Sequence, residues 1–226
     1  MAFMSDKYPR ILHFPWSPGA KNDDRIAGPE CWSNIKYKRL IFTEKMDGSN
    51  SAITKEGVFA RTRAVLSKNP WDSYLWQIQA TILPDLGDME VFVENMYAVH
   101  SIEYTKLWSY FYMFGVRENG IWKSWEDTKF IAAYFKFEMV PEYATPFEEL
   151  RDVKDERKFE VVVKKMAEQS FFGNTCEGVV VRDTDEFADR DDSTFGYNIL
   201  KYVRKDHVQT DEHWTTNWKK AKIITS

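Results

Sequence analysis

A lysine stands between two carboxylates where an apolar segment runs into a turn, in the stretch TEKMDGSN at residues 43–50. A lysine amine is a nucleophile only in its neutral form, which burial or neighbouring cations favour. The end of the apolar segment supplies partial burial for Lys45, but the Asp47 carboxylate opposes it by raising the lysine pKa. The pattern therefore requires a bound cation such as Mg²⁺, or a role for Lys45 other than attack.

Each candidate residue also has a structural interpretation. A K-x-D-G pattern is typical of an exposed lysine at a strand–turn junction, and Phe111, Tyr112 and Phe114 are equally typical of a hydrophobic core. Glu177, which precedes three valines, is typical of a carboxylate at a strand edge. Glu94 is the more informative residue, because a carboxylate within the apolar stretch VFVEN needs a partner or a chemical task.

Local patterns predict the elements that must position these side chains. Alternating and β-branched segments predict strands, and apolar residues at helical spacing predict helices. The expected strands are 38–45, two within 51–63 joined at 55–57, 89–97, a hairpin at 109–122, 176–184 and 197–204. The expected helices are 71–83, one from the capping box Ser124–Asp127 to about 136, one starting at Thr145-Pro146 with Glu148, and 155–169.

This order of strands, helix, strands, helices and strands favours an α+β fold with antiparallel sheets. The chain has 226 residues, of which 43% are hydrophobic, enough for one domain with a real core. We expect a single domain over 1–226, with residues 1–35 as an irregular N-terminal extension and 205–226 as a short C-terminal tail.

Charge and cysteine content narrow the class of protein. The net charge of −4 argues against a sequence-tolerant nucleic-acid coat protein, although local basic clusters leave room for a basic groove. Cys31 and Cys176 lie in no motif and are expected to be reduced structural thiols. No secretory leader or membrane-length apolar run is recognisable, so we expect a soluble, cytoplasmic protein that contacts no membrane.

Six short stretches, in chain order, resemble the motifs of the covalent nucleotidyltransferase superfamily of polynucleotide ligases and capping enzymes. They are EKMDGSN with Lys45, ARTR with Arg61, VFVEN with Glu94, FYMFGV with Phe114, EGVVVR with Glu177 and LKYVR with Lys201. Within the superfamily the chain is most similar to phage-type RNA ligase 2 and to small bacterial and phage RNA ligase-like proteins. It resembles the latter over about 13–214, through WSPGA-x-x-DDR at 16–25, E-N-x-Y-A-x-H-S-I-x-Y at 94–104 and KYVR-x-x-HVQTDEHW at 201–214.

The resemblance implies an adenylyltransferase fold with antiparallel sheets flanked by helices and no C-terminal OB domain. It implies an ATP-dependent RNA ligase that uses Mg²⁺ (or Mn²⁺) and acts in RNA repair, in a bacterial or phage-infected cell. In such an enzyme Lys45 becomes a lysyl-AMP, AMP passes to a 5′-phosphate, and a 3′-hydroxyl displaces it. The expected partners are RNA ends, with DNA ends as the alternative.

The resemblance also assigns roles to residues. Lys45 is the expected nucleophile, Glu94 and Glu177 the expected metal ligands, and Phe114, or else Tyr112, the expected purine-stacking ring. The residues implied in ATP binding are Glu44, Lys45, Asp47, Gly48, Asn50, Arg61, Glu94, Phe114, Glu177 and Lys201. Those implied in nucleic-acid binding are Arg63, Arg204, Lys205 and His207.

The chain departs from the family pattern in two places. The last motif usually has two lysines one residue apart, whereas Lys201 has Ile199 and Val203 at that distance, with Arg204 or Lys205 as possible substitutes. The 22 residues after the last strand cannot form the C-terminal domain of phage-type ligases, which makes a protein partner conceivable. His207, Asp211 and His213 match no standard zinc spacing.

Three other functions stay open on the sequence. The chain could be a DNA or mixed-strand ligase, a GTP-using capping enzyme, or an inactive protein that binds nucleic-acid ends. The absence of an OB domain argues against capping. The presence of Lys45, Glu94, Glu177 and Lys201 argues against an inactive protein.

Overall fold

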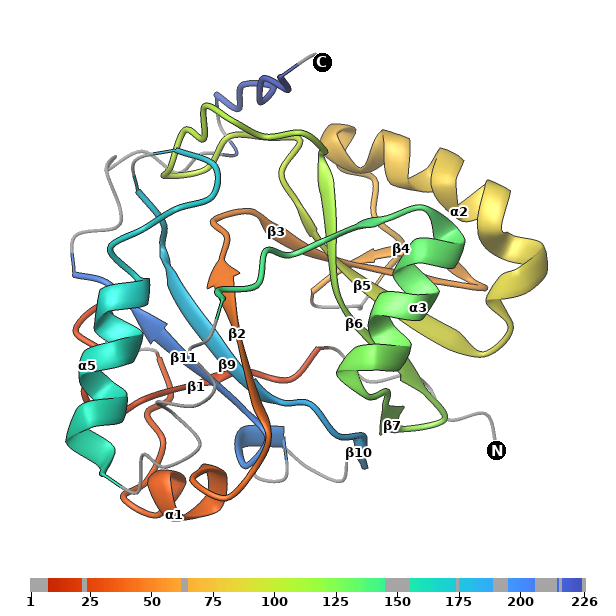
Figure 1. Cartoon of the computed structure of the whole chain (residues 1–226). Coiled ribbons are helices and arrows are strands. Elements are labelled where there is room, and N and C mark those ends of the chain that lie inside the picture. Colours follow the sequence, from red (N-terminus) through yellow and green to blue (C-terminus); the bar gives the residue numbers. More distant parts are fainter. Residues whose placement is uncertain are drawn as a thin grey trace.

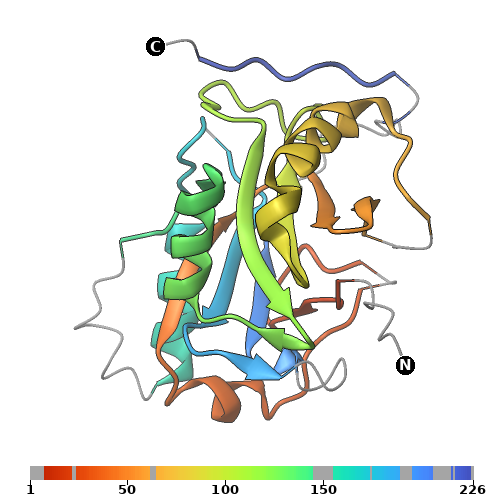
Figure 2. The same ribbon diagram turned by 90° about the vertical axis from the view of Figure 1, so that its right-hand side faces the viewer.

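The computed structural model describes residues 8–21, 24–61, 65–144, 155–173, 175–188, 195–205, 215 and 217–224. Within these ranges two β-sheets face each other, and helices cover their outer faces (Figure 1). A view turned by 90° shows the same layers edge-on (Figure 2). None of the helices in these ranges is long and apolar enough to cross a lipid bilayer.

The smaller, four-stranded sheet has the strand order β1-β11-β9-β2. Its strands are β1 (Leu12–His13), β2 (Leu40–Lys45), β9 (Gly178–Asp183) and β11 (Ile199–Val203). β2 and β11 pair antiparallel with β9, whereas β1 pairs parallel with β11. This sheet therefore joins segments from the beginning and the end of the chain.

The larger sheet has the order β10-β7-β6-β5-β3-β4, with β8 beside β6. Its strands are β3 (Ser49–Thr54), β4 (Gly57–Ala60), β5 (Met89–Asn95), β6 (Phe111–Glu118), β7 (Ile121–Trp122), β8 (Glu138–Met139) and β10 (Phe187–Ala188). The helical elements are α1 (Cys31–Ile35), a 3₁₀ turn at Pro70–Asp72, α2 (Ser73–Leu86), α3 (Trp125–Phe135) and α5 (Glu156–Met166).

Three hydrophobic clusters hold these layers together. Phe92, Phe114 and Val180 belong to the cluster between the two sheets. A second cluster packs Phe159 and Val163 of α5 against the outer face of the smaller sheet. The third packs α2 and α3 against the outer face of the larger sheet. Burial of large apolar side chains on both faces of each sheet makes the sheets rigid supports for the polar groups at their edges.

The structure confirms the α+β fold and most of the expected elements. Strand 38–45 is β2, the strands of 51–63 are β3 and β4, and the helix of 71–83 is α2, preceded by a 3₁₀ turn. Ser124 caps α3 by accepting a hydrogen bond from the Asp127 amide. Cys31 and Cys176 are buried free thiols. The expected helix start at Thr145–Glu148 lies outside the described residues.

The N-terminal segment is more ordered than its sequence predicts. Residues 1–35 are expected to be irregular, yet β1 joins the smaller sheet and α1 packs beneath it. Ser17 accepts a hydrogen bond from the Val203 amide (2.9 Å), and the Gly19 amide donates to the Val203 carbonyl (3.0 Å). The WSPGA stretch therefore holds the N-terminal segment against the end of β11 through hydrogen bonds.

Candidate active site

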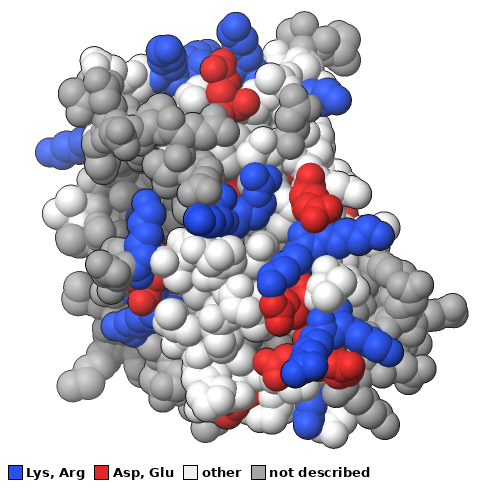
Figure 3. Space-filling view, turned by 90° about the vertical axis from the view of Figure 1, so that its left-hand side faces the viewer, with Lys and Arg blue, Asp and Glu red and all other residues white. Residues whose placement is uncertain are grey.

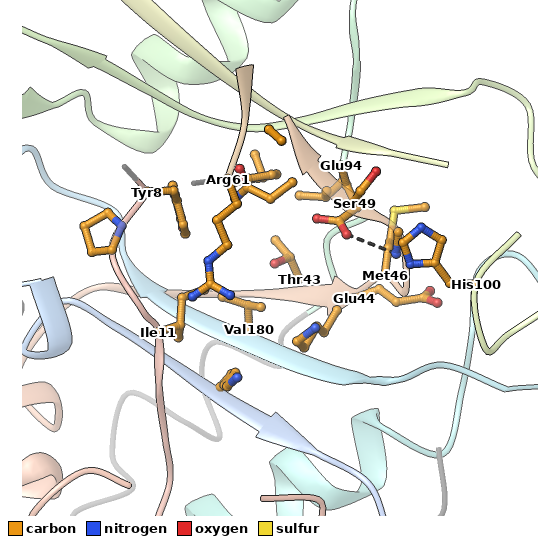
Figure 4. Close-up of a pocket in the computed structure, with 18 of the residues that line it drawn as sticks. Tyr8, Ile11, Thr43, Glu44, Met46, Ser49, Arg61, Glu94, His100 and Val180 are labelled. Carbon is orange, nitrogen blue, oxygen red and sulfur yellow. Dashed lines mark hydrogen bonds between the residues drawn. The ribbon is translucent and has the colours of Figure 1, made fainter. Parts of the chain in front are cut away.

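The two sheets enclose a cavity of about 490 Å³ between them. It falls within the size range of small-molecule sites, about 300–1,000 Å³. Strands β2, β3 and β5, the end of β4 and strand β11 all contribute to its wall. The predicted site residues that line it are Glu44, Lys45, Gly48, Asn50, Arg61, Glu94, Phe114 and Lys201. Figure 4 shows several of them around the cavity.

Two close backbone approaches position Lys45. Lys45 ends β2 directly opposite Gly178 of β9. A Cβ at position 178 would lie 1.9 Å from the Tyr202 carbonyl oxygen, and a Cβ at Gly48 would lie 2.7 Å from the Asn95 carbonyl oxygen. Both positions therefore need glycine, which explains the glycine of K-x-D-G and the glycine of EGVVVR.

Three carboxylates surround the Lys45 amine. Glu177 Oε2 accepts a hydrogen bond from Lys45 Nζ at 2.5 Å. Glu94 Oε1 accepts from the Gly48 amide at 3.0 Å, which ties the strand β5 to the turn after Lys45. Asp47 Oδ2 accepts from the Ile102 amide at 2.7 Å. The loop after residue 99 therefore fixes the position of the Asp47 carboxylate.

The charge balance at Lys45 favours its protonated form. Burial lowers the pKa of Lys45, but the Glu177, Glu94 and Asp47 carboxylates together outweigh it, and the pKa lies above its ordinary value. Burial, together with repulsion from Glu177, raises the pKa of Glu94 to about 7 and that of Asp47 to about 6. The site thus holds more negative charge than one lysine neutralises, as the sequence argument about Asp47 predicts.

The raised pKa of Glu94 gives a stability prediction. A carboxyl whose folded pKa of about 7 exceeds its unfolded value loses folding stability as the pH rises between the two values. Replacement by an amide, Glu94→Gln, removes this loss. As the pH rises from 5 to 8, we expect the free energy of unfolding of Glu94→Gln to increase on the order of 2 kcal/mol relative to that of the wild type. Urea unfolding of both proteins across this range measures the difference.

The comparison must be a difference between the two proteins, because His13 titrates in the opposite direction. Burial and Lys201 lower the pKa of His13 to about 4. The contribution of His13 to folding stability therefore increases as the pH rises from about 4 to 6.5. This contribution is common to wild type and variant and cancels. A Glu103→Gln variant, made in an exposed loop, measures the effect of removing any carboxylate. A pH-independent difference for Glu94→Gln would contradict a titrating Glu94.

The second lysine of the cavity, Lys201, is held by residues from the N-terminal segment. Lys201 Nζ lies 3.4 Å from Asp24 Oδ1, and the same oxygen lies 3.1 Å from His13 Nε2. His13 stands beside Lys201 because β1 pairs in parallel with β11. Burial and the nearby Lys45 lower the pKa of Lys201. Burial opposes ionisation of Asp24, but the Lys21 amide and Lys201 lower its pKa to about 2.

Sequence reasoning did not single out Asp24 and His13 as site residues. The only signal was WSPGA-x-x-DDR, whose last aspartate is Asp24. Arg182 was missed too: it lines the cavity from β9, opposite Ile199 of β11. Its guanidinium donates to the Phe114 carbonyl oxygen and stacks 4.7 Å over the Trp125 ring. Arg182 therefore supplies cationic charge on the strand next to the position where the expected second lysine is lacking.

Aromatic and cationic side chains form the other end of the cavity. Phe114 lines it and packs against Tyr8, with ring centroids 5.3 Å apart. Tyr112 shares this face of β6, but it is fully buried, and its hydroxyl accepts from the Trp108 and Ser109 amides. Of the two rings, only Phe114 reaches the cavity. Figure 4 shows the Arg61 side chain reaching across toward Ile11 and Val180.

Among the described residues, two polar atoms of strand β3 are buried in the cavity wall without a hydrogen-bond partner. They are Ser49 Oγ and Asn50 Oδ1, both on β3. A buried polar atom without a partner costs about 1–3 kcal/mol, so such atoms are expected where a ligand completes the hydrogen bonding. The two atoms therefore indicate that the cavity binds a polar ligand.

Of the predicted ATP-binding residues, Asp47 and Glu177 do not themselves line the cavity. Glu44 does line it, but other residues hold its carboxylate. The Glu44 carboxylate accepts from Ser170 Oγ and the Phe171 amide, both at 2.8 Å, and burial raises its pKa to about 7. Arg204 and Lys205 follow β11 and do not line the cavity. Arg63, His207 and the rest of HVQTDEHW lie outside the described residues.

The donor set suits a hard divalent cation. Magnesium is usually bound by one or two carboxylates together with waters and substrate phosphates rather than by a cage of protein ligands. No group of three or more His, Cys, Asp or Glu in the described ranges is arranged as a metal site. Glu94 and Glu177 nevertheless share one lysine within reach of the cavity, and their excess negative charge fits an added cation.

Comparisons with known proteins bear on the family and on the fold. The family model RNA ligase matches residues 38–203. An archaeal ATP-dependent RNA ligase is similar in fold (TM-score 0.54, 17% identity), over 88% of this chain and 48% of that one. So is a Naegleria gruberi RNA ligase solved with ATP and Mn (0.51, 14%, over 90% and 61%).

A putative ATP-dependent DNA ligase from Aquifex aeolicus is as similar (TM-score 0.54, 17% identity, over 88% of this chain and 50% of that one). The chain thus spans about half to three fifths of these three proteins. A search among curated proteins returned no significant match.

Proposed function

The chain belongs to the RNA ligase family, and from that premise we propose that it joins RNA ends with ATP, through a covalent lysyl-AMP at Lys45. The observation that carries the proposal is the placement of the Lys45 amine in a cavity that also holds Lys201, Arg61 and Glu94. A nucleophilic amine, cations for phosphates and carboxylates for a metal or a ribose are the groups that transfer of a nucleotidyl group requires.

The first step is attack by Lys45. Its neutral Nζ forms a bond to the α-phosphorus of ATP while the bond from that phosphorus to the bridging oxygen breaks, and pyrophosphate leaves. Glu177, which already accepts a hydrogen bond from Lys45, is positioned to receive the proton that the amine loses. Lys201 and Arg61 neutralise charge on the phosphates, and Phe114 stacks on the adenine.

Glu94 and Glu177 are the residues that would hold Mg²⁺ or Mn²⁺, which when bound supplies positive charge that offsets the phosphates and lowers the pKa of Lys45. AMP then passes from Lys45 to the 5′-phosphate of a strand, and a 3′-hydroxyl displaces AMP to seal the strand. We propose a role in RNA repair in the cytoplasm of a bacterial or phage-infected cell.

Adduct formation tests this proposal. The protein is incubated with a divalent metal and α-labelled ATP, or with α-labelled GTP, then denatured and assayed for label on the protein. Label from ATP, followed by sealing of 5′-phosphate and 3′-hydroxyl RNA ends, supports it. Label from GTP alone points to a capping enzyme. Absence of label, in protein shown by mass to carry no AMP, overturns it. Parallel DNA ends decide between RNA and DNA substrates.

Asp24 provides a further test, as a residue that positions Lys201. The change Asp24→Asn removes the carboxylate that anchors Lys201 while keeping the shape of the side chain. We expect the rate of adduct formation to fall about 10- to 100-fold, with little change in the ATP concentration that gives half the maximal rate. Rates for Asp24→Asn and Asp24→Glu are compared in single turnovers. Wild-type rates in Asp24→Asn would show that Lys201 needs no anchor.

A further inference from the structure

Five aromatic side chains gather next to the cavity, on the side where the C-terminal segment crosses the molecule. They are Trp71, Tyr74, Tyr97, Tyr110 and Trp218, here called the aromatic patch. None is buried, and Tyr74 is 43% exposed. The ring centroids of Trp71 and Trp218 are 5.9 Å apart, and those of Tyr74 and Tyr97 are 5.5 Å apart. Partly exposed rings in contact with one another form a surface that flat ligands can stack on.

Residues 218–224, here called the C-terminal strap, run extended across this end of the molecule (Figures 1 and 2). The Val99 amide donates to the Lys219 carbonyl and the Ala221 amide donates to the Tyr97 carbonyl, each at 2.8 Å. Further along, the Ile224 amide donates to the Leu107 carbonyl at 2.8 Å. Main-chain bonds therefore hold the strap in place and leave its side chains available.

The strap carries three exposed lysines, Lys219, Lys220 and Lys222, and it places Lys220 against the aromatic patch. Lys220 Nζ lies 4.9 Å from the centre of the Tyr97 ring and 5.2 Å from that of Tyr110. None of the three lysines forms an ion pair with a carboxylate of the described residues. Lys55, Lys123 and Lys164, by contrast, each have a carboxylate partner.

Trp71 connects the aromatic patch to the cavity, since it belongs to both. Its position is fixed by Asp72, which is buried and accepts hydrogen bonds from four side chains. The donors are Ser51, Ser67, Asn69 and Asn95. Asn95 follows Glu94, so one network of hydrogen bonds supports both the cavity wall and the patch. A ligand could therefore pass from one to the other over a rigid surface.

We propose that the aromatic patch and the strap lysines bind an unpaired nucleic-acid strand whose end enters the cavity. Aromatic rings stack on bases of any sequence, and lysines neutralise the intervening phosphates. A net charge of −4 requires such contacts to be local. On the face drawn in Figure 3, most of the described Lys and Arg side chains are interleaved with Asp and Glu, so the described part of that face offers no broad cationic surface. This inference rests on the proposed function, because it locates the strand that the ligase would join.

Binding of a short single-stranded RNA with a 5′-phosphate and a blocked 3′ end tests the inference by fluorescence anisotropy. Loss of one stacking ring in Trp218→Ala should weaken binding roughly five- to hundred-fold, and Trp218→Phe should restore most of it. Lys220→Gln should weaken binding and make the slope of log Kd against log salt shallower by about 0.7. The control, Lys158→Gln, removes an equal charge from α5 and should bind as the wild type does.

Lysyl-AMP formation is measured on the same variants, because it needs no RNA. Wild-type labelling with weakened RNA binding in Trp218→Ala and Lys220→Gln supports the strand site. If both variants bind RNA as tightly as the wild type, the strand site is overturned. This holds even if the aromatic patch proves to bind a protein. Failure of the wild type to take label from ATP defeats the proposed ligase activity, while the binding data still decide the strand site on their own.

Discussion

Lys45→Ala should form no detectable covalent nucleotide adduct, a loss of more than about 10⁴-fold in rate. In the proposed mechanism this amine is the group that bonds to phosphorus, and the other cationic side chains that line the described part of the cavity are poor replacements for it. The guanidinium groups of Arg61 and Arg182 are poor nucleophiles, and Lys201 is anchored to Asp24. The measurement is the amount of label on denatured protein after incubation with a divalent metal and α-labelled ATP.

Lys55→Ala is the matched control. Lys55 lies in the turn between β3 and β4, and its ion pair with Asp88 is exposed at the surface. Exposed ion pairs contribute little to stability, so this variant should fold and take label like the wild type. Label retained by Lys45→Ala and located by mass spectrometry on another residue would remove the proposed mechanism. Loss of ATP binding as well as label would instead indicate a collapsed cavity.

Glu177→Gln should move the pH dependence of adduct formation. Apart from burial, Glu177 has the largest influence on the pKa of Lys45, and it raises that pKa. Because only neutral Lys45 attacks in the proposed mechanism, the wild-type rate should rise with pH through the alkaline range. Without the Glu177 charge the pKa of Lys45 falls, so the rise should occur at lower pH.

The same change should lower the plateau rate on the order of 100-fold, because Glu177 is also a proposed metal ligand and proton acceptor. Single-turnover rates across pH, at saturating ATP and metal, separate the two effects. Glu168→Gln, at an exposed position just after α5, serves as the control. An unshifted profile with a lowered plateau would show that Glu177 acts on the metal alone and does not govern the charge of Lys45.

Much of the site could be predicted because each of its main residues lies in a short motif with its own local pattern. Lys45 ends an apolar strand before a turn, and Glu94 interrupts an apolar strand; both patterns are visible without the fold. Phe114 and Tyr112 alternate on one strand, so the sequence could select their shared face. It could not select between them, because which ring reaches the cavity depends on the depth of packing.

The rest of the site depends on contacts between distant parts of the chain. Asp24 reaches Lys201 only because β1 pairs with β11, and β1 has two residues, too few for a periodic pattern. The short strands β8 and β10 escape prediction for the same reason. β1 and β8 also make parallel pairs, so the larger and the smaller sheet are not purely antiparallel. Local sequence cannot reveal such pairs, because their partners are far away in the chain.

The pairing of β2 with β9, and of β1 with β11, has a consequence for the order of folding. Lys45 pairs with Gly178, and Leu12 pairs with Leu200, whereas β3, β4, β5 and β6 pair with near neighbours in the chain. Contacts of long sequence separation form slowly, since a large loop must close first. During synthesis the part of the larger sheet formed by β3 to β7 can therefore assemble while β9 and β11 are still unmade. Lys45 then acquires its strand partner Gly178 and its ion-pair partner Glu177 late. Under the proposed mechanism, a growing chain would therefore carry the amine before the amine could react with a nucleotide.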